Sequence, residues 1–234
     1  MEPGGPGDDL SQEPAVPEAD RGYVVAWRLG GRRVVVVGGG EVAAQKVSGL
    51  LGSGAELVVV APEVVAGLAR LADAGALTWL RRPVDDDDVA GAALVVATTG
   101  DPEVNARVAA AARRAGALVN AVDDPTNCDV TIPAVVRRGP ATVAVTTDGV
   151  SPAASRFLRE RLDAWLPVEL GAVVTEAGAA RAELRRAGRY RYDYDIWRER
   201  FFEPAIDALA AGAGPEAIHD LARRFVADFL DEPA

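Results

Sequence analysis

The apolar positions of the chain fall into short continuous runs that alternate with helically spaced segments. Val34–Val37 are four consecutive β-branched residues, a run typical of a strand that is buried on both faces. Three glycines, Gly38, Gly39 and Gly40, follow at once, and residues 41–51 then take up the apolar spacing of a helix. The pattern therefore predicts a strand, a glycine turn and a helix in that order.

The same alternation continues along the first half of the chain. Further apolar runs predict strands at residues 56–60, 76–80, 93–97 and 117–122, and helices at 63–73 and 102–114. Strands that alternate with helices indicate an α/β fold with a Rossmann-like, doubly wound parallel sheet, whose ligands bind beyond the carboxyl ends of the strands. The segments at these ends, which we expect to converge on one crevice, are Gly38–Gly40, Pro62-Glu63, Thr98-Thr99 and Asn120–Asp124.

The pattern changes after Asp124. Two β-like segments around Arg137-Arg138-Gly139-Pro140 predict a hairpin, and Ser151-Pro152 then begins a region with helices at 152–166, 168–187, 195–211 and 215–230. The predicted domains are a disordered acidic tail (1–20), a nucleotide-binding domain (21–123), a β-rich segment (124–150) and a helical C-terminal domain (151–234).

The glycine turn carries the fingerprint Gly38-x-Gly40-x-x-Ala43 of dinucleotide-binding folds. Gly38 is expected to make the tight turn, Gly40 to let the backbone approach a pyrophosphate, and Ala43 to let the helix pack closely on the strand. The helix N-terminus supplies N–H groups and a positive dipole end for the phosphates. The alternative is a glycine-rich turn that binds nothing.

The second strand departs from the usual dinucleotide pattern, because no aspartate stands at the position that contacts the adenosine ribose. The strand is followed by Ala61-Pro62-Glu63, so Glu63 is the candidate for this contact. No arginine that would favour NADP follows the strand either, and NAD is therefore the expected cofactor.

Composition and charge exclude several classes of function. The chain has 234 residues, a formal net charge of −10 and a single cysteine, Cys128. The acidic balance argues against nucleic acid and anionic membranes as partners, and one cysteine excludes an intrachain disulfide and a cysteine-based zinc site. We expect a cytoplasmic protein, because the N-terminus lacks the features of a signal peptide and no apolar run is long enough to span a bilayer.

A run of four carboxylates, Asp85 to Asp88, is the one feature that suggests a metal site. Adjacent carboxylates at the start of a helix point in different directions, so we interpret this run as a solvated N-terminal turn and predict no metal site.

Four segments occur in one order with fixed gaps: GGGEVAAQK (38–46), ATTGDPEVN (97–105), NAVDDPTNCDVTIPA (120–134) and VAVTTDGVSPAASRFLRE (143–160). Together they resemble the precorrin-2 dehydrogenase/sirohydrochlorin ferrochelatase family, over roughly residues 22–175. The resemblance implies a Rossmann domain, a β-rich dimerisation segment and a helical C-terminal region in a homodimer. It implies NAD-dependent oxidation of precorrin-2 to sirohydrochlorin and, in bifunctional members, insertion of Fe²⁺ as a further substrate.

The same resemblance assigns roles to individual residues. The catalytic aspartate of the family corresponds to Asp123, and a hydroxyl of its substrate-binding segment to Thr147. Asn120 lies near the nicotinamide end. The remaining nucleotide contacts correspond to Gly38, Gly39, Gly40, Glu41, Val42, Pro62, Glu63, Thr98 and Thr99. Because the substrate carries many carboxylates, arginines are expected to bind its rim, and by position the candidates are Arg137, Arg138 and Arg156.

Several alternatives stay open at this point. Asp123 has a competing role in stabilising the turn before Asp124-Pro125. The chain as a whole could hold NAD(H) or a tetrapyrrole without turnover, or oxidise an unrelated small substrate. Ala134 replaces a serine that is frequent in the family, and the sequence does not decide whether iron insertion is present.

Overall fold

The computed structural model describes residues 22–231, so the predicted tail at 1–20 lies outside the described residues. The chain divides into one compact unit that ends at Thr131 and a second that begins at Ile132. None of the helices in the described range is long and apolar enough to cross a membrane.

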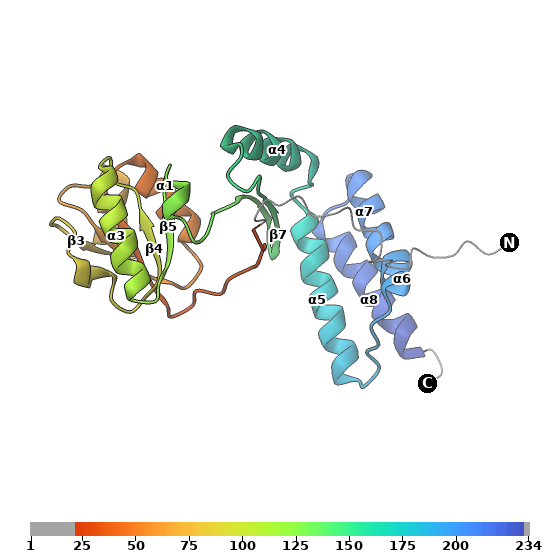
Figure 1. The fold of residues 1–234 in the computed structure, drawn as a ribbon. Coiled ribbons are helices and arrows are strands. Elements are labelled where there is room, and N and C mark those ends of the chain that lie inside the picture. Colours follow the sequence, from red (N-terminus) through yellow and green to blue (C-terminus); the bar gives the residue numbers. More distant parts are fainter. Residues whose placement is uncertain (1–21, 232–234) are drawn as a thin grey trace, which may run out of the picture. The chain divides into compact units, whose positions relative to one another are not determined.

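The first unit is a five-stranded parallel sheet (Figure 1). The strand order is β3-β2-β1-β4-β5, which confirms the predicted Rossmann-like fold class. The strands are β1 (Arg33–Val37), β2 (Glu56–Val60), β3 (Thr78–Leu80), β4 (Ala92–Ala97) and β5 (Leu118–Ala121). The connecting elements are α1 (Glu41–Leu50), α2 (Ala66–Asp73), the 3₁₀ turn η2 (Asp86–Val89), α3 (Pro102–Arg114) and the 3₁₀ turn η3 (Pro125–Asn127).

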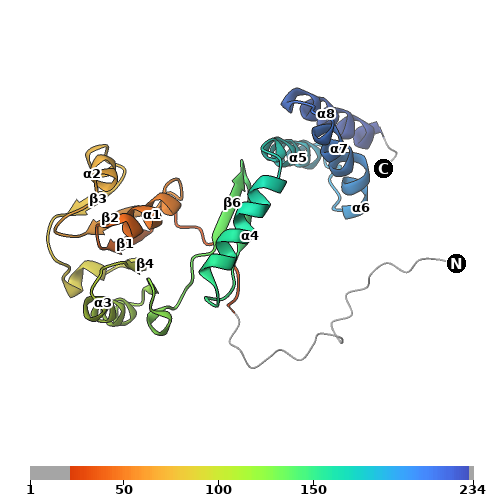
Figure 2. The same cartoon turned by 90° about the horizontal axis from the view of Figure 1, so that it is seen from above.

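Helices cover both faces of this sheet, and Figure 2 shows α2 and α3 on opposite sides of it. Side chains of β1 alternate between the two faces. Val35 and Val37 join an apolar cluster with Val108 and Ala112 of α3, whereas Val34 and Val36 join a cluster with Val47 of α1 and Leu68 of α2. The continuous valine run is therefore buried on both faces, as the pattern predicts.

Two local predictions in this unit are wrong. Helix α2 begins at Ala66 instead of residue 63, because the chain bends at Pro62 and Glu63 and Val65 N–H donates to the carbonyl of Gly39 (2.8 Å). The acidic run forms a 3₁₀ turn that is capped by Asp85, but it is not wholly solvated. Asp88 is only 6% exposed and is held by an ion pair with Arg82.

The second unit begins with an antiparallel hairpin of β6 (Ala134–Arg138) and β7 (Ala141–Val145), which confirms the predicted hairpin. The hairpin turn packs tightly against the start of helix α5 (Leu170–Arg186). A Cβ added at Gly171 would lie 3.0 Å from the backbone of Arg138 and Gly139, so a larger residue there would push the hairpin turn away by a few tenths of an ångström.

The remaining helices of the second unit are α4 (Pro152–Trp165), α6 (Tyr194–Trp197), α7 (Glu203–Ala210) and α8 (Pro215–Asp231). A π-helical segment, η4 (Arg198–Phe202), joins α6 to α7 where the sequence predicts one continuous helix. The core of these helices is aromatic, with Trp197 and Phe201 packed on Phe225 and Phe229 of α8.

Candidate functional site

A cavity of about 540 Å³ lies at the carboxyl edge of the parallel sheet. Its lining comes from the segments at the ends of β1, β2 and β4, from the loop after β3 and from helix α3. Its lining includes most of the predicted cofactor residues: Gly38, Gly39, Gly40, Pro62, Glu63, Thr98 and Thr99. We call this cavity the sheet-edge groove. The other residues that line it are Val37, Val60, Ala61, Pro83, Val84, Gly100, Val104 and Arg107.

The three positions of the turn differ in whether the fold requires glycine there. Gly38 has φ +120°, and a Cβ there would lie 2.5 Å from Thr98 Oγ1. At Gly39 a Cβ would lie 1.9 Å from the carbonyl oxygen of Glu63, so this glycine lets the loop after β2 pack on the turn. At Gly40 a Cβ would meet nothing within 4 Å in the described chain. The fold therefore requires the first two glycines and leaves open space at the third.

The open space at Gly40 adjoins the N-terminus of α1. Gly40 is the N-cap of this helix, and within the described residues no side chain caps it. Free N–H groups and the dipole of a helix start form a binding site for anions, and a glycine there lets a pyrophosphate approach the backbone. The residues therefore fit the pyrophosphate of a dinucleotide. Glu41 and Val42 are the first residues of α1 and do not belong to the lining of the groove.

The loop after β4 is held by a buried asparagine that the sequence analysis missed. Asn105 of α3 is 5% exposed. Its Oδ1 accepts from the hydroxyl of Thr99 (2.7 Å) and from Thr99 N–H (3.1 Å), and its Nδ2 donates to the carbonyl of Thr99 (3.0 Å). Thr98 in turn donates from its hydroxyl to the carbonyl of Val37 (2.9 Å). The motif Thr99-Gly-Asp-Pro-x-x-Asn105 therefore shapes the rim of the groove. The asparagine at its last position is the sequence feature from which this role could have been predicted.

The end of β2 has a neighbour that the sequence did not reveal. Leu80 of β3 pairs with Val60, so Arg81 follows β3 beside the segment that follows β2. The Arg81 guanidinium stacks on the ring of Trp79 at 4.0 Å from its centroid, and Trp79 Nε1 donates to the carbonyl of Ala61 (2.9 Å). Glu63 is exposed on the loop beyond Ala61.

Asn120, in β5, is 6% exposed and does not line the groove. Its Nδ2 donates to the carbonyl of Val130 (2.9 Å), whereas its Oδ1 is buried and has no hydrogen-bond partner in the described structure. Cys128 packs beside it, with Sγ 3.0 Å from the carbonyl oxygen of Ala121, and burial raises the pKa of this thiol. The cysteine is therefore held as a packed, protonated group.

Asp123 and Asp124 lie in the turn after β5 and have different environments. Asp123 is exposed, has φ +58°, and its carboxylate accepts no hydrogen bond from the residues that the structure describes. Asp124 accepts from Thr126 Oγ1 (2.6 Å) and Asn127 Nδ2 (2.7 Å). These bonds, that from Asn127 first, lower the pKa of Asp124. The turn-stabilising role that competes for Asp123 therefore belongs to Asp124.

The four predicted substrate residues all lie in the second unit, and three of them are engaged there. Arg138, 14% exposed, donates to the carbonyls of Asp163 and Leu166 and pairs with the Asp163 carboxylate (2.9 Å), so it fastens the end of α4. Thr147 shares its hydroxyl with Ser151 and Ser155 at the start of α4. Arg156 pairs with Glu160 (2.9 Å) on the surface of α4, and Arg137 is exposed. Arg138 thus has a structural task that the sequence did not predict.

Comparison with known proteins places this geometry in a family context. Residues 25–134 match a family described as "Putative NAD(P)-binding". The siroheme synthase of Azotobacter vinelandii is 40% identical over 190 residues, which are 81% of this chain and 41% of that protein. Siroheme synthase 1 of Aeromonas salmonicida is 43% identical over 185 residues, which are 79% of this chain and 39% of that protein. The chain therefore spans about two fifths of the length of these curated relatives.

A solved structure, named SirC, precorrin-2 dehydrogenase, matches with a TM-score of 0.69 and 26% sequence identity. The match covers 90% of this chain and 100% of that chain. The family match supports the predicted dinucleotide cofactor, of the NAD(P) type. The predicted resemblance to the precorrin-2 dehydrogenase and siroheme synthase proteins is confirmed over most of the chain, in sequence and in fold.

Proposed function

We propose that the chain oxidises precorrin-2 to sirohydrochlorin with NAD⁺ as the hydride acceptor. The observation that carries this proposal is the match to the precorrin-2 dehydrogenase SirC over that protein's whole length. The sheet-edge groove supports it, because its open position at Gly40 and the uncapped start of α1 suit a dinucleotide.

Different residues of the groove would hold the pyrophosphate and the adenosine ribose of the cofactor. The turn at Gly38–Gly40 and the N–H groups of α1 suit the pyrophosphate, and Pro62-Glu63 lies where the adenosine ribose is bound in this type of fold. Thr98-Thr99, held by Asn105, borders the same groove on the β4 side. Bound NAD⁺ supplies a two-electron acceptor for hydride.

The oxidation removes a hydride and a proton from the tetrapyrrole, so a base must take the proton. We assign this role to Asp123, which has no internal hydrogen-bond partner among the described residues and faces solvent. Its left-handed backbone conformation is uncommon for a residue other than glycine and is frequent at functional sites. Asn120 is assigned to the nicotinamide end on the resemblance alone, because its side chain is buried and does not line the groove.

We assign the binding of the substrate carboxylates to arginines of the second unit. Arg137 is exposed and Arg156 is held only by a surface pair with Glu160, so both guanidinium groups are available. Thr147 and Arg138 are the weaker candidates, because their polar atoms already bind within the unit.

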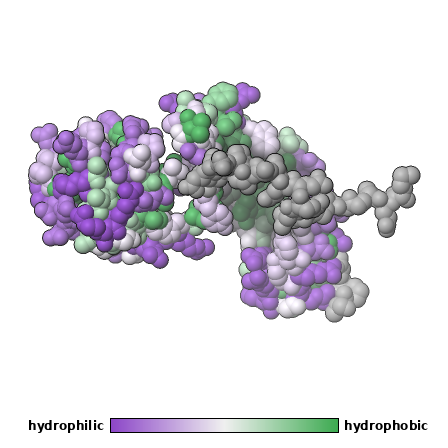
Figure 3. Space-filling model, in the orientation of Figure 1, coloured by the Kyte–Doolittle hydropathy of each residue, from purple (hydrophilic) through white to green (hydrophobic). Residues whose placement is uncertain are grey.

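The protein is further proposed to act as a cytoplasmic homodimer, with the second unit forming the contact. Helix α4 has no buried residue in the described chain, and it exposes Phe157 (60%) and Trp165 (75%). Figure 3 shows hydrophobic side chains interspersed with hydrophilic ones over this helix. A helix with large exposed apolar residues is typical of a protein–protein contact.

An anaerobic assay of the purified protein with precorrin-2 and NAD⁺ tests the proposal. We expect the absorbance spectrum of sirohydrochlorin to appear together with NADH. Binding of NAD⁺ without turnover in this assay would instead identify a protein that holds NAD(H) or a tetrapyrrole. A second reaction with sirohydrochlorin and Fe²⁺ then asks whether iron insertion accompanies the oxidation.

A further inference from the structure

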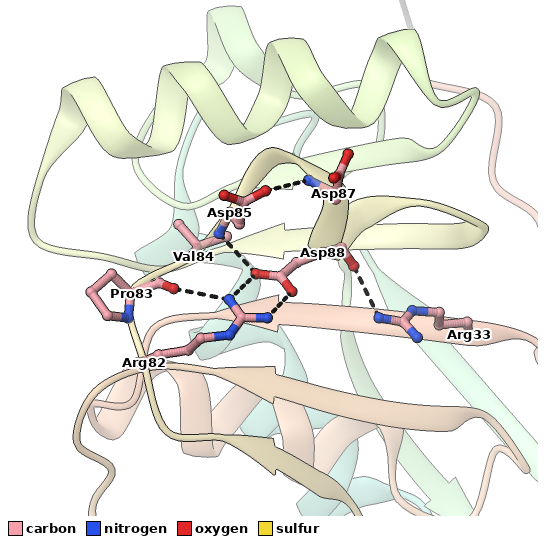
Figure 4. A pocket seen from close by; sticks show the side chains of 7 residues that line it. All are labelled: Arg33, Arg82, Pro83, Val84, Asp85, Asp87 and Asp88. Atoms are coloured by element: carbon pink, nitrogen blue, oxygen red, sulfur yellow. Dashed lines mark hydrogen bonds and ion pairs between the residues drawn. The ribbon is translucent and has the colours of Figure 1, made fainter.

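Pro83 and Val84 form a thin wall between two cavities. On one side they line the sheet-edge groove. On the other side they line a second cavity of about 490 Å³ (Figure 4), together with Arg33, Arg82, Asp85, Asp87 and Asp88. Pro83 is exposed, and Val84 packs only partly against the apolar cluster beneath α3. Because empty space adjoins both sides of the wall, its position depends on polar contacts more than on close packing.

The strongest of these contacts is the ion pair between Arg82 and Asp88. Arg82 Nη1 and Nη2 donate to the two carboxylate oxygens of Asp88 at 2.7 and 2.6 Å, a bidentate geometry. Arg82 Nη1 also donates to the carbonyl of Pro83 (3.1 Å). Asp88 accepts in addition from Asp85 N–H (2.8 Å). One buried carboxylate therefore binds the residue before Pro83 and the residue after Val84. Figure 4 shows these contacts converging between Arg82 and Asp88, beside Pro83 and Val84.

Further contacts fasten the same loop to the rest of the unit. Arg33 of β1 donates from Nη2 to the backbone carbonyl of Asp88 (3.0 Å). Arg107 of α3 donates from Nη2 to the carbonyl of Val84 (3.2 Å) and pairs with Asp86, which also pairs with Arg114 (3.1 Å). Arg107 itself lines the sheet-edge groove. The wall is thus held by the buried Asp88 carboxylate and by Arg107 of α3.

The wall borders a defined part of the groove. It follows β3, whose partner β2 leads into Pro62-Glu63, the position of the adenosine ribose in dinucleotide-binding sheets. A shift of this wall would therefore change the adenosine end of the groove and leave the turn after β5, with Asp123, unchanged.

We propose that the Arg82–Asp88 ion pair is a positioning device for the cofactor: it holds Pro83 and Val84 at the adenosine end of the dinucleotide groove. This inference rests on the proposed function, because it assumes that the groove binds NAD⁺. The competing interpretation is that the pair only stabilises the fold. Only the Asp88 side of this pair is buried, and neither buried nor exposed ion pairs are strong evidence for stability, so experiment must separate the two roles.

The test compares Asp88→Asn with the unchanged protein, by calorimetric titration with NAD⁺ and by steady-state kinetics. The asparagine keeps the size of the side chain and loses the ionic pair. We expect NAD⁺ affinity to fall about tenfold and KM for NAD⁺ to rise by a similar factor, because misplaced binding groups weaken binding steeply. The turnover number at saturating NAD⁺ and KM for the tetrapyrrole should stay unchanged. Arg82→Lys, which keeps the charge but not the bidentate geometry, should give an intermediate loss.

Val89→Ala is the matched control for stability. Val89 is the next residue, is 1% exposed, and lines neither cavity, so its truncation destabilises the same turn without touching the ion pair. NAD⁺ affinity that is equal in Asp88→Asn and the unchanged protein, or that falls as much in Val89→Ala, would overturn the proposal. If Asp88→Asn does not fold, Arg82→Gln at the half-exposed partner carries the same expectation. Failure of the unchanged protein to bind NAD⁺ would overturn both this inference and the proposed function.

Discussion

Asp123 and Asp124 are adjacent carboxylates with separate tasks, and the separation can be measured. Asp124 supports the turn through two side-chain hydrogen bonds, whereas Asp123 has no such bond among the described residues. We expect Asp123→Asn to lower the turnover number by at least about 100-fold, the usual effect of removing a general base. Asparagine tolerates the left-handed conformation, so the melting temperature should stay the same.

Asp124→Ala is the control for this substitution. It should lower the melting temperature through loss of the two hydrogen bonds and should affect turnover less than Asp123→Asn does. Full activity of Asp123→Asn in the anaerobic assay would remove Asp123 from the mechanism.

The environment of Asp88 also predicts how the stability of the protein depends on pH. The hydrogen bonds from Arg82 hold the pKa of Asp88 below its usual value, and the Asp85 backbone adds to this effect. A carboxyl whose pKa is lower in the folded state stabilises the protein above its unfolded-state pKa of about 4, and this stability is lost as the pH falls through the folded-state pKa. Urea unfolding should therefore show the largest difference between the unchanged protein and Asp88→Asn at pH 5 to 7. The difference should shrink below about pH 4, and one that is constant down to pH 3 would contradict this assignment.

At the scale of elements, the glycine turn separates the needs of the fold from those of the ligand. Gly40→Ser introduces a good N-cap for α1 at a position with open space, so unfolding free energy should stay within about 0.5 kcal/mol or rise. The same side chain would occupy the place of the pyrophosphate. We therefore expect NAD⁺ affinity to fall roughly tenfold or more while the protein stays folded.

Gly39→Ser is the matched substitution one residue earlier. Its Cβ would lie 1.9 Å from the Glu63 carbonyl oxygen, so the loops after β1 and β2 must separate. Overpacking of this kind costs on the order of 3 kcal/mol, which chemical denaturation would detect. Equal stability of the two variants would contradict this division of roles within the turn.

At the scale of the whole molecule, the exposed apolar side of α4 predicts self-association. Phe157→Glu together with Trp165→Glu would place two charges on this surface, and we expect the proposed dimer to become a monomer in light scattering coupled to size-exclusion chromatography. Ile206→Glu, at an exposed apolar residue of α7, is the control and should leave the molecular mass unchanged. A dimer that persists in the α4 variant would place the contact elsewhere.

The sequence was sufficient for most of the elements and for three of the four segments expected in the groove, whereas the fourth, Asn120–Asp124, does not line it. Valine runs, glycine breaks and Asp101-Pro102 at the start of α3 are local signals, and the strands and helices follow from them within a few residues. The carboxyl ends of parallel strands meet at one edge, so the order of the elements alone brings Gly38, Pro62 and Thr98 to one cavity.

Only the tertiary structure decided which polar side chains are partners. Asp88 looked like one of four solvated carboxylates, but the path of the loop turns it inward onto Arg82 and leaves its neighbours outside. Likewise the hairpin carries Arg138 to the end of α4, and the register of β3 brings Arg81 beside the end of β2. Hydrophobic periodicity is a property of consecutive residues, so it can be read from the sequence alone. The pairing of charges depends on where distant segments meet, and no local pattern records that.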